Sequence, residues 1–385
     1  MEIKKRLEKI INQRKTLLGV GPMSLNVIDA SIELSNQFNL PLMMIASRRQ
    51  IDAKKFGGGY VNKWDTESFS KYVKKKDKKK NIILCRDHGG PWQNDLEIRK
   101  RLNIKDAMIS AKSSYMEDIK NNFKIIHIDA SLFLSEKNRI KLSLERTYEL
   151  YDYCYQISRK LKKEILIEVG TEEQSGSTNT FEEIEFFLEK LVSFCEKAKL
   201  PKLFFIVLQS GTKVMERRNV GIFDSNIRIK NQIPVEIQIF KLLEICKKFG
   251  VYFKEHNTDY LTSESLRWHP FLGIHASNVA PEFGVAETKK LFELMHRYNP
   301  KLKNEFIELC VNSKKWKKWV LNENLPDQEK ALICGHYLFS SVEGREIISQ
   351  LNFDLKKRKL NLNEILKNSI KESILRYLKN FRLIN

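Results

Sequence analysis

The sequence predicts an α/β protein, a (β/α)8 barrel of the TIM type with a helical C-terminal extension. Eight short runs rich in Val, Ile, Leu and Phe alternate with stretches of helical periodicity. Such runs are typical of strands covered on both faces, and their alternation with helices favours parallel βα units. An open doubly wound sheet is the alternative, but GVGPMS after the first run lacks the glycine pattern of a dinucleotide-binding fold. The predicted strands are residues 16–21, 41–47, 81–87, 124–130, 164–170, 203–209, 251–256 and 271–277.

The clearest predicted helices follow the first, fourth, fifth and sixth strands. Apolar side chains recur there at three- and four-residue spacing, which indicates helices with one buried face. Beyond about residue 286 the strand pattern stops and the chain is helical and rich in Lys. A single barrel needs about 250 residues, so we assign residues 1–300 to the barrel. Residues 301–385 are then a helical extension that caps the barrel or mediates oligomerisation. The four helices are residues 26–39, 144–163, 181–198 and 236–250.

The net charge of +20 raises the question of a nucleic-acid partner. Lys supplies most of this charge, and the densest run, KKKDKKK at residues 74–80, lies between two predicted elements with no aromatic residue interleaved. A platform for nucleic-acid strands would interleave aromatic rings with the cations. We therefore interpret the charge as a solvated, Lys-rich surface that also attracts anionic substrates, and we expect no nucleic-acid partner.

Localisation follows from three simple features. No run approaches the roughly 18–20 apolar residues that span a bilayer, and the charged, helix-periodic start of the chain lacks the apolar segment of a signal peptide. The six Cys residues are scattered and form no CxxC pair. We expect a cytoplasmic protein without disulfides, and no membrane partner.

Polar residues gather where the predicted strands end, which is where barrel enzymes carry their catalytic groups. His88 and His256 each follow an acidic residue at a strand end, and they are the preferred metal ligands. His127 and His275 also lie in predicted strands, and for these a purely structural role is equally open. Glu172 is the candidate third ligand, because it follows the fifth strand. Other carboxylates lie close to it in sequence, and a bound cation would reduce the repulsion between them.

Basic residues near the predicted barrel mouth suit a phosphate or carboxylate group. Arg48 and Arg49 follow the second strand and Lys213 the sixth, and guanidinium groups bind such anions well. Glycine in the FGGGY segment, Gly58 included, lets backbone amides approach an anion closely, although a loop explains it equally well. The expected substrate-binding residues are Arg48, Arg49, Gln50, Gly58, Asp129, Gln209, Lys213 and Asn278.

Five segments together resemble a known family, the class II tagatose-bisphosphate aldolase subunit usually called non-catalytic, with related ketose-phosphate epimerases. They are IASRRQIDAKKFGGGY, ILCRDHGGPWQ, KIIHIDAS, EVGTEEQSG and FKEHNTDY. The resemblance spans roughly residues 17–300 and implies a zinc-type barrel with metal at His88 and His256, and Asp87 and Glu172 as the acidic residues beside it. The chain departs from the family in having Arg49 where Asn is usual, which suggests a more anionic substrate. Its sixth strand also lacks the His that catalytic aldolases place there.

The sequence thus favours an enzyme that uses Zn²⁺, or another divalent metal, to make or break the C3–C4 bond of an anionic sugar. Asp87 or Glu172 is expected to take the C4 hydroxyl proton, and Asp259 or Tyr260 is the candidate second acid or base. Release of the aldehyde fragment makes an aldolase, and its rotation and re-addition an epimerase. The alternative is a non-catalytic scaffold that stabilises a partner aldolase subunit. A homo-oligomer or such a partner is the expected assembly.

Overall fold

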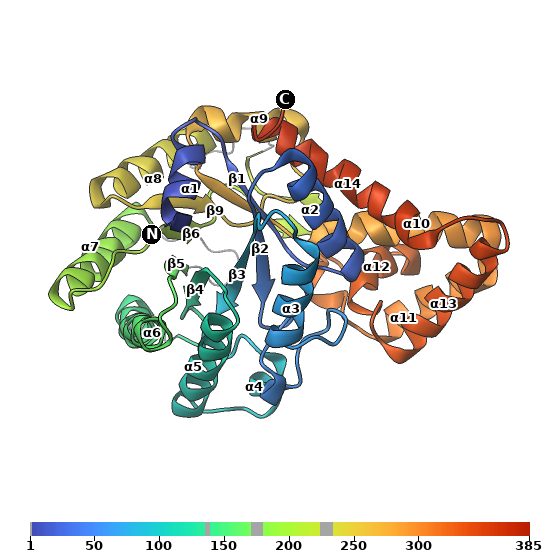
Figure 1. The fold of residues 1–385 in the computed structure, drawn as a ribbon, viewed down its shortest axis with the longest axis horizontal. Helices are drawn as coiled ribbons and strands as arrows, with labels where there is room; N and C mark the ends of the chain where they lie inside the picture. Colours follow the sequence, from blue (N-terminus) through green and yellow to red (C-terminus); the bar gives the residue numbers. More distant parts are fainter. Residues whose placement is uncertain (1, 135–138, 171–179, 224–233) are drawn as a thin grey trace.

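The computed structural model describes residues 2–134, 139–170, 180–223 and 234–385, and its centre is a closed barrel of eight parallel strands (Figure 1). Each strand pairs with the next along the chain, apart from a short inserted hairpin, and the last pairs with the first. The predicted barrel is thereby confirmed. Its strands are β1 (Leu17–Val20), β2 (Leu42–Ser47), β3 (Ile82–Gly89), β4 (Ile125–Asp129), β5 (Leu166–Gly170), β6 (Phe205–Leu208), β9 (Tyr252–Glu255) and β10 (Ala276–Val279).

A helix follows every barrel strand and covers its outer face (Figure 1). Local capping fixes where several begin: the Ser24 side chain accepts from the Val27 amide at the start of α2, and Thr180 and Glu183 form a capping box on α7. A shorter helix, α4 (Asp95–Arg99), precedes α5. The covering helices are α2 (Leu25–Phe38), α3 (Thr66–Lys76), α5 (Ile104–Lys120), α6 (Arg139–Leu161), α7 (Phe181–Lys197), α8 (Val235–Phe249), α9 (Ser263–Leu272) and α10 (Pro281–Tyr298).

The N-terminal end of the barrel is closed by α1 (Glu2–Ile11). Leu7 and Ile11 on this helix are buried against inward-facing barrel residues that include Met43, Ile83 and Phe205. Because this end is filled with hydrocarbon, only the opposite end, where the strands finish, is open for chemistry. This is the usual arrangement of barrel enzymes.

The eighth strand lies later than the sequence predicts. We expected residues 271–277, but Phe271 and Leu272 belong to α9, and Gly273 ends that helix in a left-handed conformation with φ 87°. Glycine adopts this conformation without strain, so it is a strong helix stop. The strand is therefore Ala276–Val279, and His275 precedes it at the closed end of the barrel.

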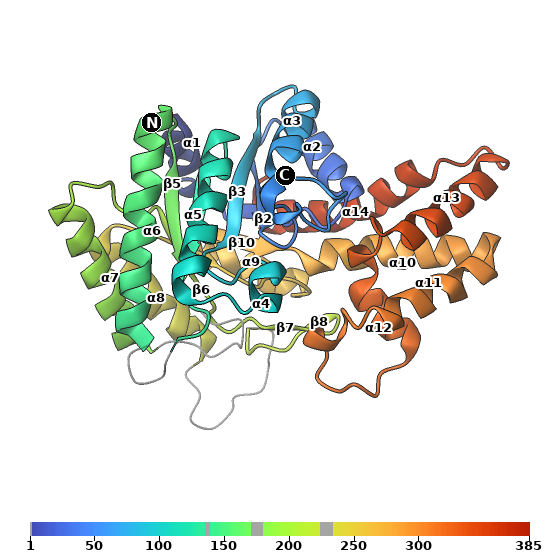
Figure 2. The ribbon, with the colours of Figure 1, turned by 90° about the horizontal axis from the view of Figure 1, so that it is seen from below.

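The C-terminal extension forms a second hydrophobic core beside the barrel. The helix α10 runs out of the barrel into this group, as Figure 2 shows. Leu291 and Met295 on α10 pack there with Phe306, Leu332 and Leu351 from later elements. The elements are α11 (Pro300–Asn312), η3 (Lys317–Trp319), α12 (Asp327–Cys334), η4 (Gly335–Tyr337) and α13 (Val342–Lys356).

The last helix, α14 (Leu362–Asn380), returns to the barrel (Figure 1). Ile370, Ile374 and Tyr377 are fully buried in the barrel's own core, where α14 packs against α2, α9 and α10. The extension is thus tied to the barrel at both of its ends, by α10 where it begins and by α14 where it finishes.

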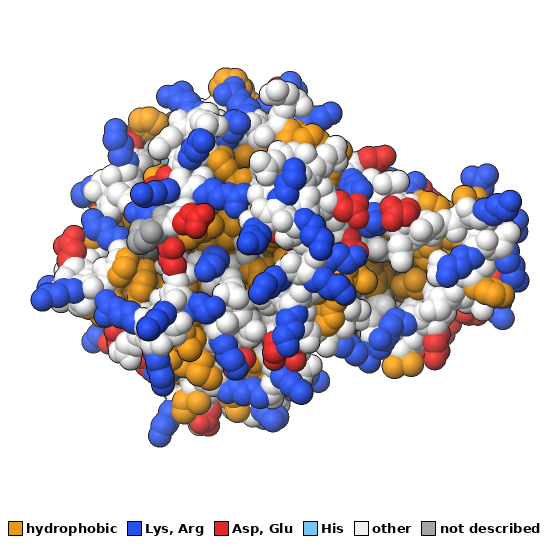
Figure 3. All heavy atoms as spheres, viewed as in Figure 1, with side chains coloured by type: hydrophobic (Ala, Val, Ile, Leu, Met, Phe, Trp, Pro, Cys, Tyr) orange, Lys and Arg blue, Asp and Glu red, His pale blue; other side chains and the backbone are white. Residues whose placement is uncertain are grey.

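Charge is spread over the surface. Figure 3 shows Lys and Arg side chains distributed across one whole face, among polar and apolar groups, rather than gathered in a single patch. The Lys run at residues 74–80 begins in the last turn of α3 and continues into the following turn. Among the described residues, no helix is long and apolar enough to cross a membrane. All six cysteines are buried and unpaired.

Candidate functional site

A pocket of about 400 Å³ opens at the C-terminal ends of the barrel strands. Its lining comes from the loops and strand ends after β1, β2, β3, β6, β9 and β10, and also from the C-terminal extension. Three of the predicted site residues, Asp87, His88 and His256, line it together. The polar ends of β3 and β9 therefore share one cavity.

An irregularity in β3 presents two of these side chains side by side. The register between β3 and β4 shifts between Arg86 and Gly89, and His88 takes a left-handed backbone with φ 42°. A bulge of this kind re-aims side chains that would otherwise alternate between the two faces of the sheet. Asp87 and His88 both line the pocket as a result.

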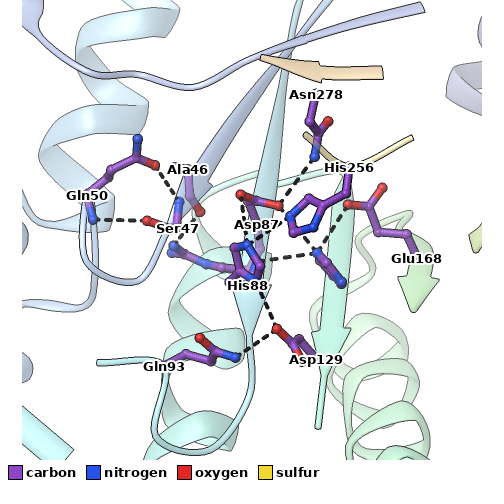
Figure 4. Close-up of polar contacts among 12 residues, drawn as sticks. Ala46, Ser47, Gln50, Asp87, His88, Gln93, Asp129, Glu168, His256 and Asn278 are labelled. Carbon is purple, nitrogen blue, oxygen red and sulfur yellow. Dashed lines mark hydrogen bonds and ion pairs between the residues drawn. The ribbon is translucent and has the colours of Figure 1, made fainter. Parts of the chain in front are cut away.

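His256 approaches His88 from the other side of the pocket. The two Nε2 atoms lie 2.9 Å apart, and the ring centroids 4.7 Å apart. The Asp87 carboxylate completes the group, since donor atoms of the three residues all lie within 4.8 Å of one another. Figure 4 shows these side chains pointing toward one another above the strand ends.

Asp129 fixes the orientation of the His88 ring. Its Oδ2 lies 2.8 Å from His88 Nδ1 and accepts a hydrogen bond from Gln93 Nε2, also at 2.8 Å (Figure 4). A carboxylate on Nδ1 requires the proton there, which leaves the His88 Nε2 lone pair directed at His256. Metal-binding His residues are held by such a carboxylate in many proteins.

The three donors fit a divalent cation. Two Nε2 atoms facing each other at 2.9 Å need either one proton between them or one cation that both lone pairs reach. Two imidazoles and a carboxylate are a donor set that zinc accepts. A further acceptor, the buried Asn278 Oδ1, has no hydrogen-bond partner among the described residues, and Asn278 lines the same pocket.

The neighbouring charges shift the pKa values of Asp87, His88 and His256 in different directions. Burial alone would raise the pKa of Asp87, but the neighbouring His88 and His127 outweigh it and hold that pKa well below its usual range. Burial would lower the pKa of His88, yet Asp87 and Asp129 raise it. Burial and the charge of His88 lower the pKa of His256 to about 3. The carboxylates thus favour positive charge on His88, whereas His256 favours its neutral form, which is the form that binds a metal.

A second group of donors, Asp87, His127 and Glu168, shares Asp87 with the first, and its other two members do not line the pocket. Here a cation is already present, because Lys254 Nζ lies 3.0 and 2.9 Å from the two Glu168 carboxylate oxygens, and both side chains are fully buried. His127 Nδ1 lies 3.4 Å from Asp87 Oδ1. Of the two groups, His88, His256 and Asp87 are therefore the better candidate metal site, because no Lys side chain is paired with them as Lys254 is with Glu168.

The sequence analysis did not single out Lys254 or choose Glu168. A signal was present, because Glu168 interrupts an otherwise apolar strand, His127 lies between two Ile residues, and Lys254 follows Tyr252 and Phe253. A charged group inside a buried strand must find an opposite charge. His127 and Glu168 are register partners on β4 and β5, which brings them together once the strands pair.

The predicted substrate-binding residues divide into two groups. Five of them line the pocket and three do not. Gln50 is held there by hydrogen bonds from Ser47 N to its Oε1 and from its Nε2 to Met23 Sδ. The residues that line the pocket are Arg49, Gln50, Gln209, Lys213 and Asn278, and those that do not are Arg48, Gly58 and Asp129.

Arg48 is a structural residue rather than a ligand contact. Its side chain is fully buried, with Nε 3.0 Å from Asp52 Oδ2 and Nη1 2.6 Å from Glu97 Oε1, and Nη1 also donates to the Gly90 carbonyl. These partners leave it turned away from the pocket, joining the loops after β2 and β3. Sequence position alone cannot distinguish it from Arg49, because neighbouring side chains point in different directions.

Gly58 also has a backbone role. It has φ 70°, and a Cβ atom there would lie 2.8 Å from the Trp64 carbonyl oxygen. The residue is needed for the tight course of the loop after β2.

Asp259 and Tyr260 differ in their relation to the pocket. Asp259 lines it, and its Oδ1 accepts from the amides of Ala280 and Glu282 at the start of α10. Burial is the main reason that its pKa is raised to about 7. Tyr260 is absent from the pocket lining, and its amide donates to Glu282 Oε2. Glu172, the predicted third ligand, lies outside the described residues.

No protein-family model matches this chain, and no curated protein matches it in sequence. Solved structures resemble it in fold. A probable tagatose 6-phosphate kinase from Sinorhizobium meliloti is 16% identical with a TM-score of 0.72, covering 95% of this chain and 100% of its own. A fructuronate-tagaturonate epimerase from Cohnella laeviribosi is 9% identical with a TM-score of 0.59, covering 96% and 81%.

A fructose-bisphosphate aldolase from Campylobacter jejuni is 13% identical with a TM-score of 0.55, covering 99% of this chain and 93% of its own. At these identities the shared feature is the barrel fold with its additional helices. The neighbours include aldolases and an epimerase, the two kinds of protein to which the sequence resemblance points.

Proposed function

We propose that this protein is a metal-dependent enzyme that makes and breaks the C3–C4 bond of an anionic ketose, as an epimerase or an aldolase. The observation that carries the proposal is the convergence of His88, His256 and Asp87, with the two Nε2 atoms 2.9 Å apart. Solved aldolases and an epimerase with the same barrel fold support this class of chemistry.

Zn²⁺, or another divalent metal, bound by these three residues would polarise the ketose carbonyl and stabilise the negative charge that develops when the bond breaks. The protein's own part begins with positioning. Asn278 offers a buried oxygen acceptor to a sugar hydroxyl, and Gln50 and Gln209 line the same pocket. These groups hold an open-chain sugar with its reacting carbons near His88.

Asp87 is the proposed base. One oxygen takes the C4 hydroxyl proton, while the other, beside His88, would stay on the metal. As that proton leaves, a carbonyl forms at C4, the C3–C4 bond breaks, and its electron pair passes to the carbonyl side of the ketose. Glu172 remains the alternative base and the alternative third ligand proposed from the sequence.

Epimerisation needs a second acid or base on the other face of the aldehyde, because the re-formed hydroxyl must receive a proton there. Asp259 is our candidate, since it lines the pocket and its pKa of about 7 lets it exchange protons near neutral pH. Tyr260 is the less favoured candidate, because it does not line the pocket.

The experiment measures metal content and activity on the same preparations. We expect about one divalent metal per chain, turnover of ketose phosphates or uronates, and loss of that turnover with a chelator. His88→Ala and His256→Ala should each lower activity by more than about 100-fold. His296→Ala is the matched control, because His296 is exposed on α10 and does not line the pocket. Full activity in metal-stripped protein contradicts the proposal.

The scaffold alternative predicts a different result from the same preparations. A non-catalytic subunit would contain little metal and no activity of its own, yet it would raise the activity or yield of a co-expressed class II aldolase. Gel filtration of the two chains together then shows a complex. Low metal content, no activity and a complex with the aldolase together would show that the protein is a scaffold and not an enzyme.

A further inference from the structure

The C-terminal extension supplies part of the pocket wall. Lys318 and Trp319 from η3 and Tyr337 from η4 line the pocket together with Arg49 and Tyr60 from the loop after β2. The sequence resemblance covers roughly residues 17–300, so it assigns no role to these three extension residues. They nevertheless share one cavity with His88 and His256.

The aromatic part of this wall is fixed by its own contacts. Trp319 Nε1 donates to the Tyr337 hydroxyl at 3.0 Å, and the Tyr60 and Tyr337 rings meet edge to face with centroids 4.8 Å apart. Lys318 Nζ lies over the Trp319 ring, 4.5 Å from its centroid. Aromatic faces of this kind contact the C–H groups of a sugar chain and hold a cation nearby.

The extension is also anchored to the barrel loops beside the pocket. The Glu216 amide, in the hairpin of β7 (Val214–Met215) and β8 (Arg218–Asn219), donates to the Trp319 carbonyl at 2.6 Å. Arg217 in the same hairpin lies 2.5 Å from Glu329 on α12. These contacts fix the position of the extension relative to the loop after β6. The same loop also supplies Lys213 and Val214 to the pocket.

Positive charge exceeds negative charge at this wall. Arg49 pairs with Asp95 at 2.6 Å, whereas no carboxylate among the described residues lies within ion-pair distance of Lys318. Lys318 is exposed, yet the protein packed around it, and then the charge of Arg49, lower its pKa, and the nearby charge of Asp95 offsets this only in part. An anion placed between Lys318 and Arg49 would relieve their repulsion.

We propose that Lys318 and Arg49 form an anion subsite, in which the C-terminal extension selects substrates that carry a phosphate or carboxylate group. Trp319 and Tyr337 contact the carbon chain beside that group. The identity of the substrate as a sugar rests on the proposed function, whereas the anion subsite rests on the charges and contacts of the wall itself. The extension thus acts in substrate recognition as well as in packing.

Direct binding tests the subsite without any need for catalysis. Titration calorimetry of inorganic phosphate into metal-stripped full-length protein should show binding that Lys318→Met weakens about tenfold, the value of one charge-assisted hydrogen bond. Lys318→Arg should retain it, which shows that the fold tolerates substitution there. Lys317→Met is the matched control, because Lys317 pairs with Glu323 outside the pocket. Acetate in place of phosphate distinguishes a carboxylate subsite from a phosphate subsite.

Kinetics provide the second measurement. With an active preparation, Lys318→Met should raise KM for an anionic ketose about tenfold, with little change in kcat and none in kcat/KM for the uncharged sugar. If wild type and Lys318→Met bind phosphate and acetate equally well, the subsite proposal is wrong. It is also wrong if Lys318→Met loses kcat/KM equally on charged and uncharged sugars. An inactive protein that still binds phosphate through Lys318 contradicts the proposed function alone.

Discussion

At the scale of single residues, the site depends on how His88 is held. Its position after a strand was visible in the sequence, but its left-handed backbone and its contact with Asp129 were not. Asp129 was expected to bind substrate, and the structure instead places it behind the His88 ring, absent from the pocket lining. A carboxylate there sets the tautomer that leaves Nε2 free to bind a metal.

Asp129→Asn tests this orienting role. The substitution keeps the size of the side chain and removes its charge, so His88 loses the partner that fixes its Nδ1 proton. Metal affinity should fall by about 10- to 100-fold while the protein stays folded. Competition with a chromogenic chelator measures the affinity, and Asp106→Asn, at an exposed carboxylate on α5, should leave it unchanged. Equal affinity in both variants would show that Asp129 does not orient the ligand.

At the scale of elements, α14 is the helix on which the barrel and the extension both depend. Its residues after Leu366 pack on α2, α9 and α10, in the core that surrounds the strands. Arg376 on the same helix lies 2.7 Å from Glu282 at the start of α10, and it also donates to the Leu261 carbonyl. The last helix of the chain thus fastens the loop after β9, which carries Asp259.

Ile374→Ala tests that dependence. Ile374 is fully buried, and removing its side chain should lower the free energy of unfolding by about 2–5 kcal/mol through lost burial and the cavity left behind. Urea unfolding monitored by circular dichroism measures the change. Glu372→Ala, at an exposed position on the same helix, should shift it by less than about 0.5 kcal/mol. Similar stability in the two variants would mean that the barrel does not need α14.

At the scale of the whole molecule, stability should depend on pH through buried carboxyl groups. Glu287 on α10 is buried at the start of α2, where Asn26 donates to it at 2.7 Å and Ser24 also donates. Burial raises its pKa from the usual 4.5 to about 7. A carboxyl group of this kind keeps its proton in the folded chain at a pH where the unfolded chain has lost it.

Its contribution to stability is therefore present below pH 4.5 and is lost as the pH rises to about 7. Relative to Glu287→Gln, which cannot ionise, the wild-type protein should lose about 3 kcal/mol of unfolding free energy across that interval. Urea unfolding at a series of pH values gives the difference between the two proteins. A difference that stays constant with pH would show that folding does not raise the pKa of Glu287.

The sequence by itself determined the barrel and the two imidazoles at its mouth. Apolar strands and amphipathic helices can bury their apolar faces together in few ways, and strand ends meet at one end of a parallel barrel. For this reason the convergence of His88, His256 and Asp87 could be predicted from their positions in the chain, and their role as a site stays a prediction. Arg49, Gln50, Gln209, Lys213 and Asn278 were placed at the pocket for the same reason.

Only the tertiary structure decided which neighbours face the pocket and what lies behind them. Arg48 and Arg49 are adjacent in sequence, yet one is buried among carboxylates and the other lines the cavity. Lys318 and Tyr337 enter the site from more than 200 residues beyond Asp87, through contacts between elements that no local pattern encodes. Side-chain direction and long-range packing depend on the folded surroundings, whereas strand and helix periodicity depends on nearest neighbours.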